Sequence, residues 1–98
     1  MTWLTVITVV RNDAVGLQRT AQSLAASLRT GIEWVVIDGS DDPATVASIV
    51  GDRGLVTWTE PRGIYSAMNE GLRRASGDFV LFLNAGDALA SASVLTDV

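Results

Sequence analysis

The sequence contains no cysteine, no histidine and no lysine, so all seven of its basic residues are arginine. Without cysteine, a disulfide framework and a thiolate metal site are both excluded. The formal net charge is −4 and the arginines form no basic cluster, which makes a nucleic acid or an anionic membrane a poor partner. An acidic site that accepts a phosphorylated ligand needs a divalent cation to bridge the like charges.

Long apolar runs are also absent, because none approaches the roughly 20 residues of a transmembrane helix. Met1-Thr2-Trp3 leads directly into a strand pattern without a basic segment, so no signal peptide is expected. We therefore expect a cytoplasmic chain, or one held peripherally at the inner face of the membrane. Its 98 residues, 48% of them hydrophobic, are enough for one small domain over residues 1–98.

Four short apolar segments predict buried strands. The clearest is Phe79–Leu83, five apolar residues bounded by Gly77 and a polar turn, which is the length of a strand rather than of a helix. Trp3–Val10 is β-branched and apolar throughout. The remaining two segments are Trp34–Ile37 and the less clearly marked Leu55–Trp58.

Three helices are expected between these strands. The first, Ala14–Leu28, carries an apolar stripe, and the second runs from Pro43 to Gly51 behind Asp42. The third has Ile64, Met68 and Leu72 at i+4 spacing with Ala67, Gly71 and Ala75 beside them. Strand–helix alternation predicts a three-layer α/β fold, a parallel sheet of order 3-2-1-4 with helices on both faces. Met68 and the three tryptophans are expected in the core, and residues 88–98 as a loop and a short helix.

Polar loops follow all four predicted strands, and parallel strands bring such loops to one edge of the sheet. They are Arg11-Asn12, Asp38 to Asp42, Glu60 to Gly63, and Asn84 to Asp87. Each loop alone is ordinary turn or cap chemistry, but ligands of open α/β sheets bind at the carboxyl edge where these loops converge. There is no P-loop and no G-x-G-x-x-G motif. We therefore expect a carboxylate site in which one aspartate holds a base or ribose and another reaches a metal that carries a pyrophosphate.

Four motifs in order resemble the amino-terminal half of a family 2 glycosyltransferase of the GT-A fold, closest to the colanic-acid and exopolysaccharide type. They are Ile7–Asn12, Val36–Asp42, Glu60–Gly71 and Ala75–Asp87. The ordered set is specific, although no motif is specific alone. The resemblance implies an inverting transferase that binds a UDP- or GDP-linked sugar with Mg²⁺ or Mn²⁺, for transfer to a glycan or lipid-linked acceptor.

The resemblance also implies roles for individual residues. Thr8, Val9, Val10 and Arg11 line the nucleotide pocket, with Arg11 where an aromatic residue often stacks on the base. Asp38 of the Asp38-Gly39-Ser40 motif hydrogen-bonds the base. Arg62, Gly63 and Asn69 lie near the diphosphate and the donor sugar. The segment Asn84, Ala85, Gly86, Asp87 occupies the place of the metal signature, with Asp87 as the carboxylate that reaches the metal.

The chain departs from the family pattern in three ways. Asn84 and Gly86 replace two acids of the usual Asp-Ala-Asp-Asp, Ser66 stands where an aspartate is frequent, and the loop after Pro61 is one residue short. The half that supplies acceptor binding and the general base has no counterpart in the 98 residues. We therefore expect a donor-binding region that does not transfer sugar alone.

Three further hypotheses concern class and assembly. A catalytically inactive nucleotide-binding or assembly module of the same fold remains an alternative. A response-regulator receiver also clusters aspartates at strand ends, but it needs a lysine that this chain lacks. In the 3-2-1-4 order the strand Phe79–Leu83 is an open apolar edge, which predicts a homo-oligomer unless residues 88–98 fold back over it.

Overall fold

The computed structural model describes residues 2–25 and 31–85, which form one parallel sheet and three helices. The strands are β1 (Leu4–Val10), β2 (Ile32–Asp38), β3 (Leu55–Trp58) and β4 (Phe79–Phe82), and the helices are α1 (Ala14–Leu24), α2 (Pro43–Val50) and α3 (Ile64–Arg74). The strand order is β3-β2-β1-β4, and every neighbouring pair is parallel. The predicted fold class and strand order are confirmed.

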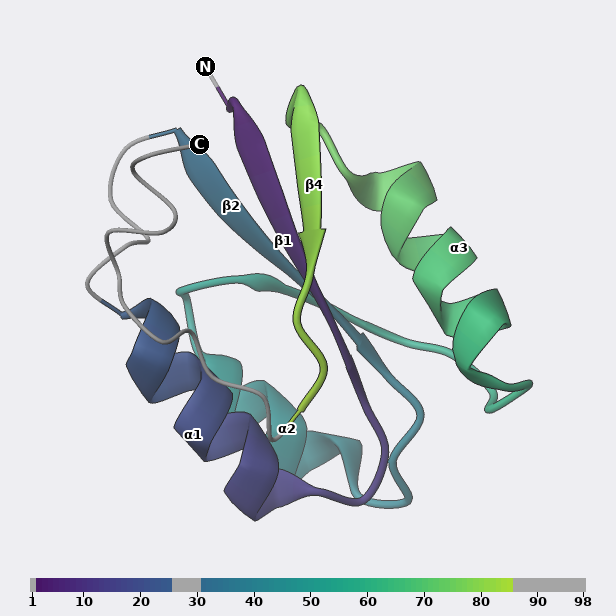
Figure 1. Cartoon of the computed structure of the whole chain (residues 1–98). Helices are drawn as coiled ribbons and strands as arrows, with labels where there is room; N and C mark the ends of the chain where they lie inside the picture. The colour runs from purple at the N-terminus through teal and green to yellow at the C-terminus, as the bar shows by residue number, and fades with distance from the viewer. Residues whose placement is uncertain (1, 26–30, 86–98) are drawn as a thin grey trace.

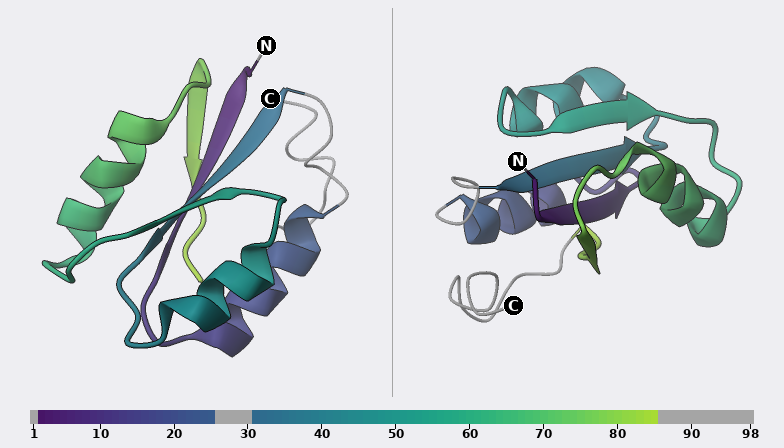
Figure 2. Two further views of the ribbon diagram at one scale, coloured as in Figure 1. Left: turned by 180° about the vertical axis from the view of Figure 1, so that it is seen from behind. Right: turned by 90° about the horizontal axis from the view of Figure 1, so that it is seen from above.

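The helices divide between the two faces of the sheet, with α1 and α2 side by side on one face and α3 on the other (Figures 1 and 2). Side chains alternate along each strand, so one strand serves two cores. The larger core joins β1 and β2 to α1 and α2, and it includes Val6, Trp34 and Val36. The smaller core lies under α3 and is built on Ile7, Val35 and Ile37.

Helix α3 packs through its small residues rather than through its large apolar stripe. Ala67 and Ala75 contact the smaller core, and Gly71 is buried. Ile64 and Leu72 are instead 48% and 45% exposed. The close approach of helix to sheet selects the small side chains, because only these leave room for the strands beneath.

An aspartate precedes each of the helices α1 and α2, but only the first caps its helix through a side-chain hydrogen bond to the backbone. The side chain of Asp13 accepts a hydrogen bond from the backbone N–H of Gly16 at 2.9 Å, which caps α1. Pro43 occupies the first turn of α2 behind Asp42, whose carboxylate accepts from the Thr45 hydroxyl rather than from a backbone N–H. Helix α1 ends at Leu24 with Ala25 as its C-cap, and residues 26–28 of the predicted helix lie outside the described residues.

The tryptophans occupy three different environments. Trp34 is buried and donates its indole N–H to the hydroxyl of Thr8 at 2.9 Å, and Trp3 is half-buried. Trp58 is 51% exposed, so the expectation that all three lie in the core is wrong for this residue. It ends the edge strand β3, and its indole N–H donates to the Ser40 carbonyl at 3.0 Å.

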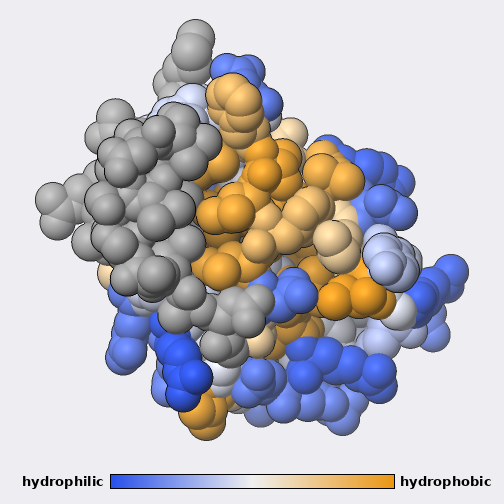
Figure 3. All heavy atoms as spheres, viewed as in Figure 1, coloured by the Kyte–Doolittle hydropathy of each residue, from blue (hydrophilic) through white to orange (hydrophobic). Residues whose placement is uncertain are grey.

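An apolar surface extends over β4 and the neighbouring elements (Figure 3). Phe79 and Val80 of β4 are 58% and 37% exposed, and Ile64 and Leu72 of α3 are exposed as well. The predicted loop and short helix at residues 88–98 lie outside the described residues. None of the described helices is long and apolar enough to span a bilayer.

Candidate functional site

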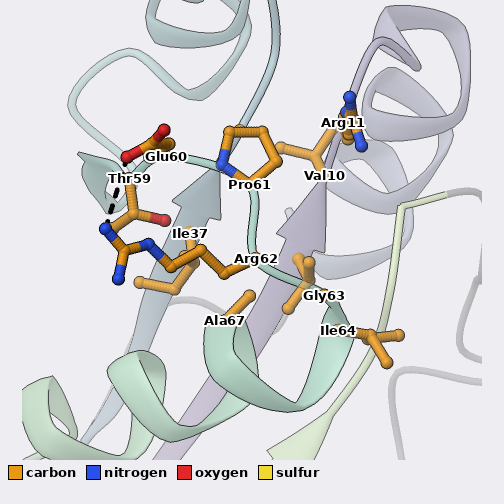
Figure 4. A pocket seen from close by; sticks show the side chains of 12 residues that line it. Val10, Arg11, Ile37, Thr59, Glu60, Pro61, Arg62, Gly63, Ile64 and Ala67 are labelled. Atoms are coloured by element: carbon orange, nitrogen blue, oxygen red, sulfur yellow. Dashed lines mark hydrogen bonds and ion pairs between the residues drawn. The ribbon is translucent and has the colours of Figure 1, made fainter.

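A cavity of about 250 Å³ lies at the carboxyl edge of the sheet, on the side of α3 (Figure 4). Its walls come from the ends of β1 and β2, from the loop after β3 and from the first turn of α3. The lining residues are Val9, Val10, Arg11, Ile37, Gly39, Thr59, Glu60, Pro61, Arg62, Gly63, Ile64 and Ala67. Three of the four predicted polar loops therefore contribute to one hollow.

The cavity combines apolar walls with charged residues. Val9, Ile37 and Pro61 are among the apolar lining residues, and Arg11 and Arg62 supply the cations. Apolar walls with a few polar groups are typical of small-molecule sites. This combination suits a ligand with a flat apolar ring and an anionic tail.

Both arginines are available to a ligand. Arg62 contacts Glu60 at 3.4 Å, and the two side chains are 73% and 71% exposed (Figure 4). Such exposed pairs contribute little to stability, so a bound anion can displace the carboxylate. Arg11 is exposed and has no hydrogen bond or ion pair with any of the described residues.

The first turn of α3 adds backbone donors at the same place. Gly63, with φ 99°, precedes the helix, and no side chain caps its N-terminus. Gly63 and Ile64 both line the cavity. Free N–H groups and the helix dipole favour negative charge at this place, directly after Arg62 in the chain.

Asp38 lies at the same edge but does not line the cavity. Its side chain is fully buried, with Oδ1 accepting from the backbone N–H of Ser40 at 2.8 Å and Oδ2 without a partner in the described part of the chain. Strand alternation places it on the face opposite to Ile37, the side of α1 and α2. The cavity wall at the end of β2 is therefore an isoleucine.

The other predicted residues, apart from the segment after β4, divide into three groups. Val9, Val10, Arg11, Gly39, Arg62 and Gly63 line the cavity. Thr8 is fully buried and accepts from Trp34, so its side chain serves the larger core. Asn69 lines a second, polar cavity of about 630 Å³, which shares Thr59, Glu60 and Arg62 with the first.

The segment after β4 is described as far as Ala85. Its backbone continues beside β1, since the N–H of Ala85 donates to the Val9 carbonyl at 3.1 Å. The carbonyl of Asn84 accepts from the Thr20 hydroxyl at 3.4 Å, and its side-chain oxygen is buried without a partner in the described part of the chain. Gly86 and the predicted metal ligand Asp87 lie outside the described residues.

Sequence reasoning missed a network centred on Ser40. The Ser40 hydroxyl accepts from the backbone N–H of Asn12 at 2.8 Å, its N–H donates to Asp38, and its carbonyl accepts from Trp58. The network therefore ties together the ends of β1, β2 and β3. The signal in the sequence was the pair of short polar side chains, Asn12 and Ser40, in consecutive strand-end loops.

Comparison with known proteins identifies the family. Residues 5–95 match the family model described as glycosyl transferase family 2, so the chain belongs to that family. An uncharacterized glycosyltransferase of Mycobacterium tuberculosis is 42% identical over an alignment of 96 residues, and the match covers 94% of this chain and 37% of the relative.

Two solved structures share the fold. The mannosyltransferase of Pyrobaculum calidifontis in complex with GDP-Man and Mn²⁺ matches with a TM-score of 0.80 and 27% identity, over 94% of this chain and 30% of that one. Staphylococcus aureus TarS in complex with UDP-GlcNAc matches with a TM-score of 0.81 at 24% identity, over 98% of this chain and 30% of that one, which shows the fold alone. The chain therefore spans about a third of these proteins.

Proposed function

We propose that this chain is the donor-binding region of a glycosyltransferase, and that its cavity at the carboxyl edge holds the nucleoside diphosphate of a nucleotide sugar. The observation that carries the proposal is the cavity itself, with apolar walls at Val9, Ile37 and Pro61 and cations at Arg11 and Arg62. A nucleobase suits the walls, and a diphosphate suits Arg62 and the start of α3. The complex of the Pyrobaculum relative with GDP-Man supports this ligand class.

The chain provides some of the oxygen ligands that a divalent metal would need. Mg²⁺ and Mn²⁺ take oxygen ligands and commonly combine one or two carboxylates with substrate phosphates. The buried, unpartnered oxygen of Asn84 is one such ligand, and we propose Asp87 as the carboxylate. The described residues contain no group of three acidic or metal-ligating side chains, so a metal here depends on the donor's own phosphates. When bound, it would neutralise charge on the leaving diphosphate.

We propose binding rather than turnover for these 98 residues. Inverting transfer needs a base within hydrogen-bond reach of the acceptor hydroxyl. Among the described residues that line the cavity, the one carboxylate is Glu60, which lies beside Arg62. The donor sugar, the acceptor and any transfer by a longer protein are part of the same proposal.

Calorimetric titration with UDP and with GDP, each with and without Mn²⁺, tests the proposal. We expect saturable binding of one nucleotide, strengthened by Mn²⁺. Arg62→Gln should weaken it about tenfold, because one charge-assisted contact to phosphate is lost. Arg19→Gln is the matched control, since Arg19 is exposed on α1 and does not line the cavity. Absence of binding for both nucleotides up to millimolar concentration would refute the proposal.

A further inference from the structure

Asn12, directly after the cavity residue Arg11, has a backbone conformation that is uncommon for residues other than glycine. Its φ is 54°, and it is the one non-glycine residue with positive φ in the described part of the chain. Asparagine enters this left-handed region more readily than most residues, but a single residue stays there when its surroundings hold it. We therefore expect specific contacts to hold the turn after β1 in this conformation.

Those contacts form a two-way clamp between the loops after β1 and β2. The side-chain oxygen of Asn12 accepts from the backbone N–H of Asp41 at 2.9 Å, and its amide nitrogen donates to the Asp41 carboxylate at 3.3 Å. A third bond joins the backbone N–H of Asn12 to the Ser40 hydroxyl at 2.8 Å. An amide that accepts with one end and donates with the other is matched to both groups of Asp41.

The clamp lies beside the cavity without lining it. Arg11 precedes Asn12 and lines the cavity, and Gly39 lines it one residue before Ser40. Arg11 has no hydrogen bond or ion pair of its own with the described residues, so its position depends on the backbone on either side of it, where β1 precedes it and the clamp follows. Side chains that bind a ligand need such support from residues that do not touch it.

We propose that Asn12 is a positioning residue of the donor cavity, whose clamp on Asp41 holds Arg11 where its guanidinium stacks on the nucleobase. This inference rests on the proposed function, because it assumes that a nucleotide occupies the cavity. Guanidinium groups stack on flat rings when their orientation is maintained. Loss of the clamp releases the turn, so Arg11 samples positions away from the base and affinity falls.

A charge-swap series tests the clamp. In Asn12→Asp, two carboxylates face each other at residues 12 and 41, and we expect UDP or GDP binding in the presence of Mn²⁺ to weaken about tenfold. The double variant Asn12→Asp with Asp41→Asn restores a carboxylate–amide pair at the parent's net charge, and affinity should return to within about twofold of the parent. A double variant as weak as Asn12→Asp would overturn the proposal.

Asn12→Gly separates the backbone conformation from the hydrogen bonds. Glycine adopts positive φ freely but cannot form the clamp, so we expect it to bind about as weakly as Asn12→Asp. Binding equal to that of the parent would overturn the proposal, because the turn would then suffice alone.

A double-mutant cycle with Arg11→Gln distinguishes positioning from general stability. If Asn12 acts through Arg11, then Asn12→Gly costs no affinity once Arg11 is replaced, whereas a purely structural role costs the same in both backgrounds. The melting temperature of each variant without nucleotide shows how far the substitution destabilises the fold. Failure of the parent to bind either nucleotide refutes the proposed function itself, while additive effects in a parent that binds refute only the role of Asn12.

Discussion

A Cβ atom placed on Gly71 of α3 would lie 2.5 Å from Cγ2 of Ile7 in β1. Both residues are buried, and Ile7 is part of the smaller core that α3 covers. The helix therefore contacts the strand almost through its backbone. A β-branched side chain such as Ile7 has few alternative rotamers, so it cannot move aside easily.

Replacing Gly71 with valine should destabilise the fold by about 2–3 kcal/mol, the usual cost of overpacking a well-filled core. Ser66→Val is the matched control, because Ser66 is exposed on the same helix and the substitution introduces the same side chain. Urea denaturation of both variants measures the difference. Equal midpoints for Gly71→Val and the parent would show that α3 can move away from β1.

Glu33 lies at the amino edge of the sheet, opposite the edge that carries the cavity, and it joins three parts of the chain. Its Oε1 accepts from the Thr5 hydroxyl at 2.9 Å and from the Ser76 backbone N–H at 2.8 Å, and its Oε2 accepts from the Ser76 hydroxyl at 2.7 Å. Burial alone raises the pKa of Glu33, but the bonds from Ser76 and Thr5 outweigh it, and the pKa is lowered overall. The carboxylate thus links β2 to β1 and to the turn before β4.

The lowered pKa predicts a stability that depends on pH. A carboxyl whose pKa is lower in the folded state stabilises the fold above its unfolded value, and this contribution is lost as pH falls through the folded value. Chemical denaturation between about pH 6 and pH 3 should therefore show a steeper loss for the parent than for Glu33→Gln. Identical pH profiles would contradict the role of Glu33.

Glu70→Gln provides the comparison for that experiment. Hydrogen bonding from Arg73 lowers the pKa of Glu70, with further contributions from Arg74, against a smaller opposing effect of burial. The arginine side chains are 76% and 47% exposed, so water and salt screen the pairs. We expect Glu70→Gln to change the pH profile less than Glu33→Gln does. A larger change for Glu70→Gln would show that the sensitivity to acid comes from helix α3 instead.

The sequence predicted the strand order and the loops that meet at the site, because β-branched runs and strand–helix alternation are properties of whole segments. Which side chain in each loop faces the cavity depends on a period of two residues, so an assignment that is one position off moves to the opposite face. Asp38 and Thr8 point away from α3, while their neighbours Ile37 and Val9 line the cavity. Side-chain chemistry favoured Asp38 as the residue that faces the ligand, but strand alternation places Ile37 in the cavity wall instead.

Helical periodicity likewise did not predict which face of helix α3 packs against the sheet. Ile64, Met68 and Leu72 form a regular apolar stripe, and the small residues beside them gave no comparable signal. The distance between helix and sheet decided which side faces inward, and this distance is a property of the packed structure. The stripe is consequently left half exposed beside β4.

Substitution of the two predicted site aspartates should distinguish support of the nucleotide cavity from binding of the metal. We expect Asp38→Asn to weaken nucleotide binding with or without Mn²⁺, because Asp38 anchors the Ser40 network under the cavity wall. Asp87→Asn should abolish only the part of the affinity that depends on Mn²⁺. Calorimetric titrations with and without the metal measure both effects, and parent-like binding by both variants would show that neither aspartate serves the site.

Strand β4 forms the edge of the described sheet, pairing with β1 on one side and with no other strand described here. Phe79 and Val80 are exposed on this strand, which contributes to the apolar surface seen in Figure 3. An apolar edge with free backbone groups favours pairing with another chain, and an identical copy offers the same edge in return.

We therefore expect a homodimer or a higher oligomer that forms through β4, with a sedimentation coefficient that rises with protein concentration. Val80→Lys places a charge on the edge strand and should leave a monomer. Val15→Lys should associate like the parent, because Val15 is 76% exposed on α1, away from β4. A monomeric parent at all concentrations would contradict the prediction. Hydrogen exchange of the 79–83 amides would then identify the cause, since slow exchange indicates that residues 88–98 cover the edge, and fast exchange indicates that nothing does.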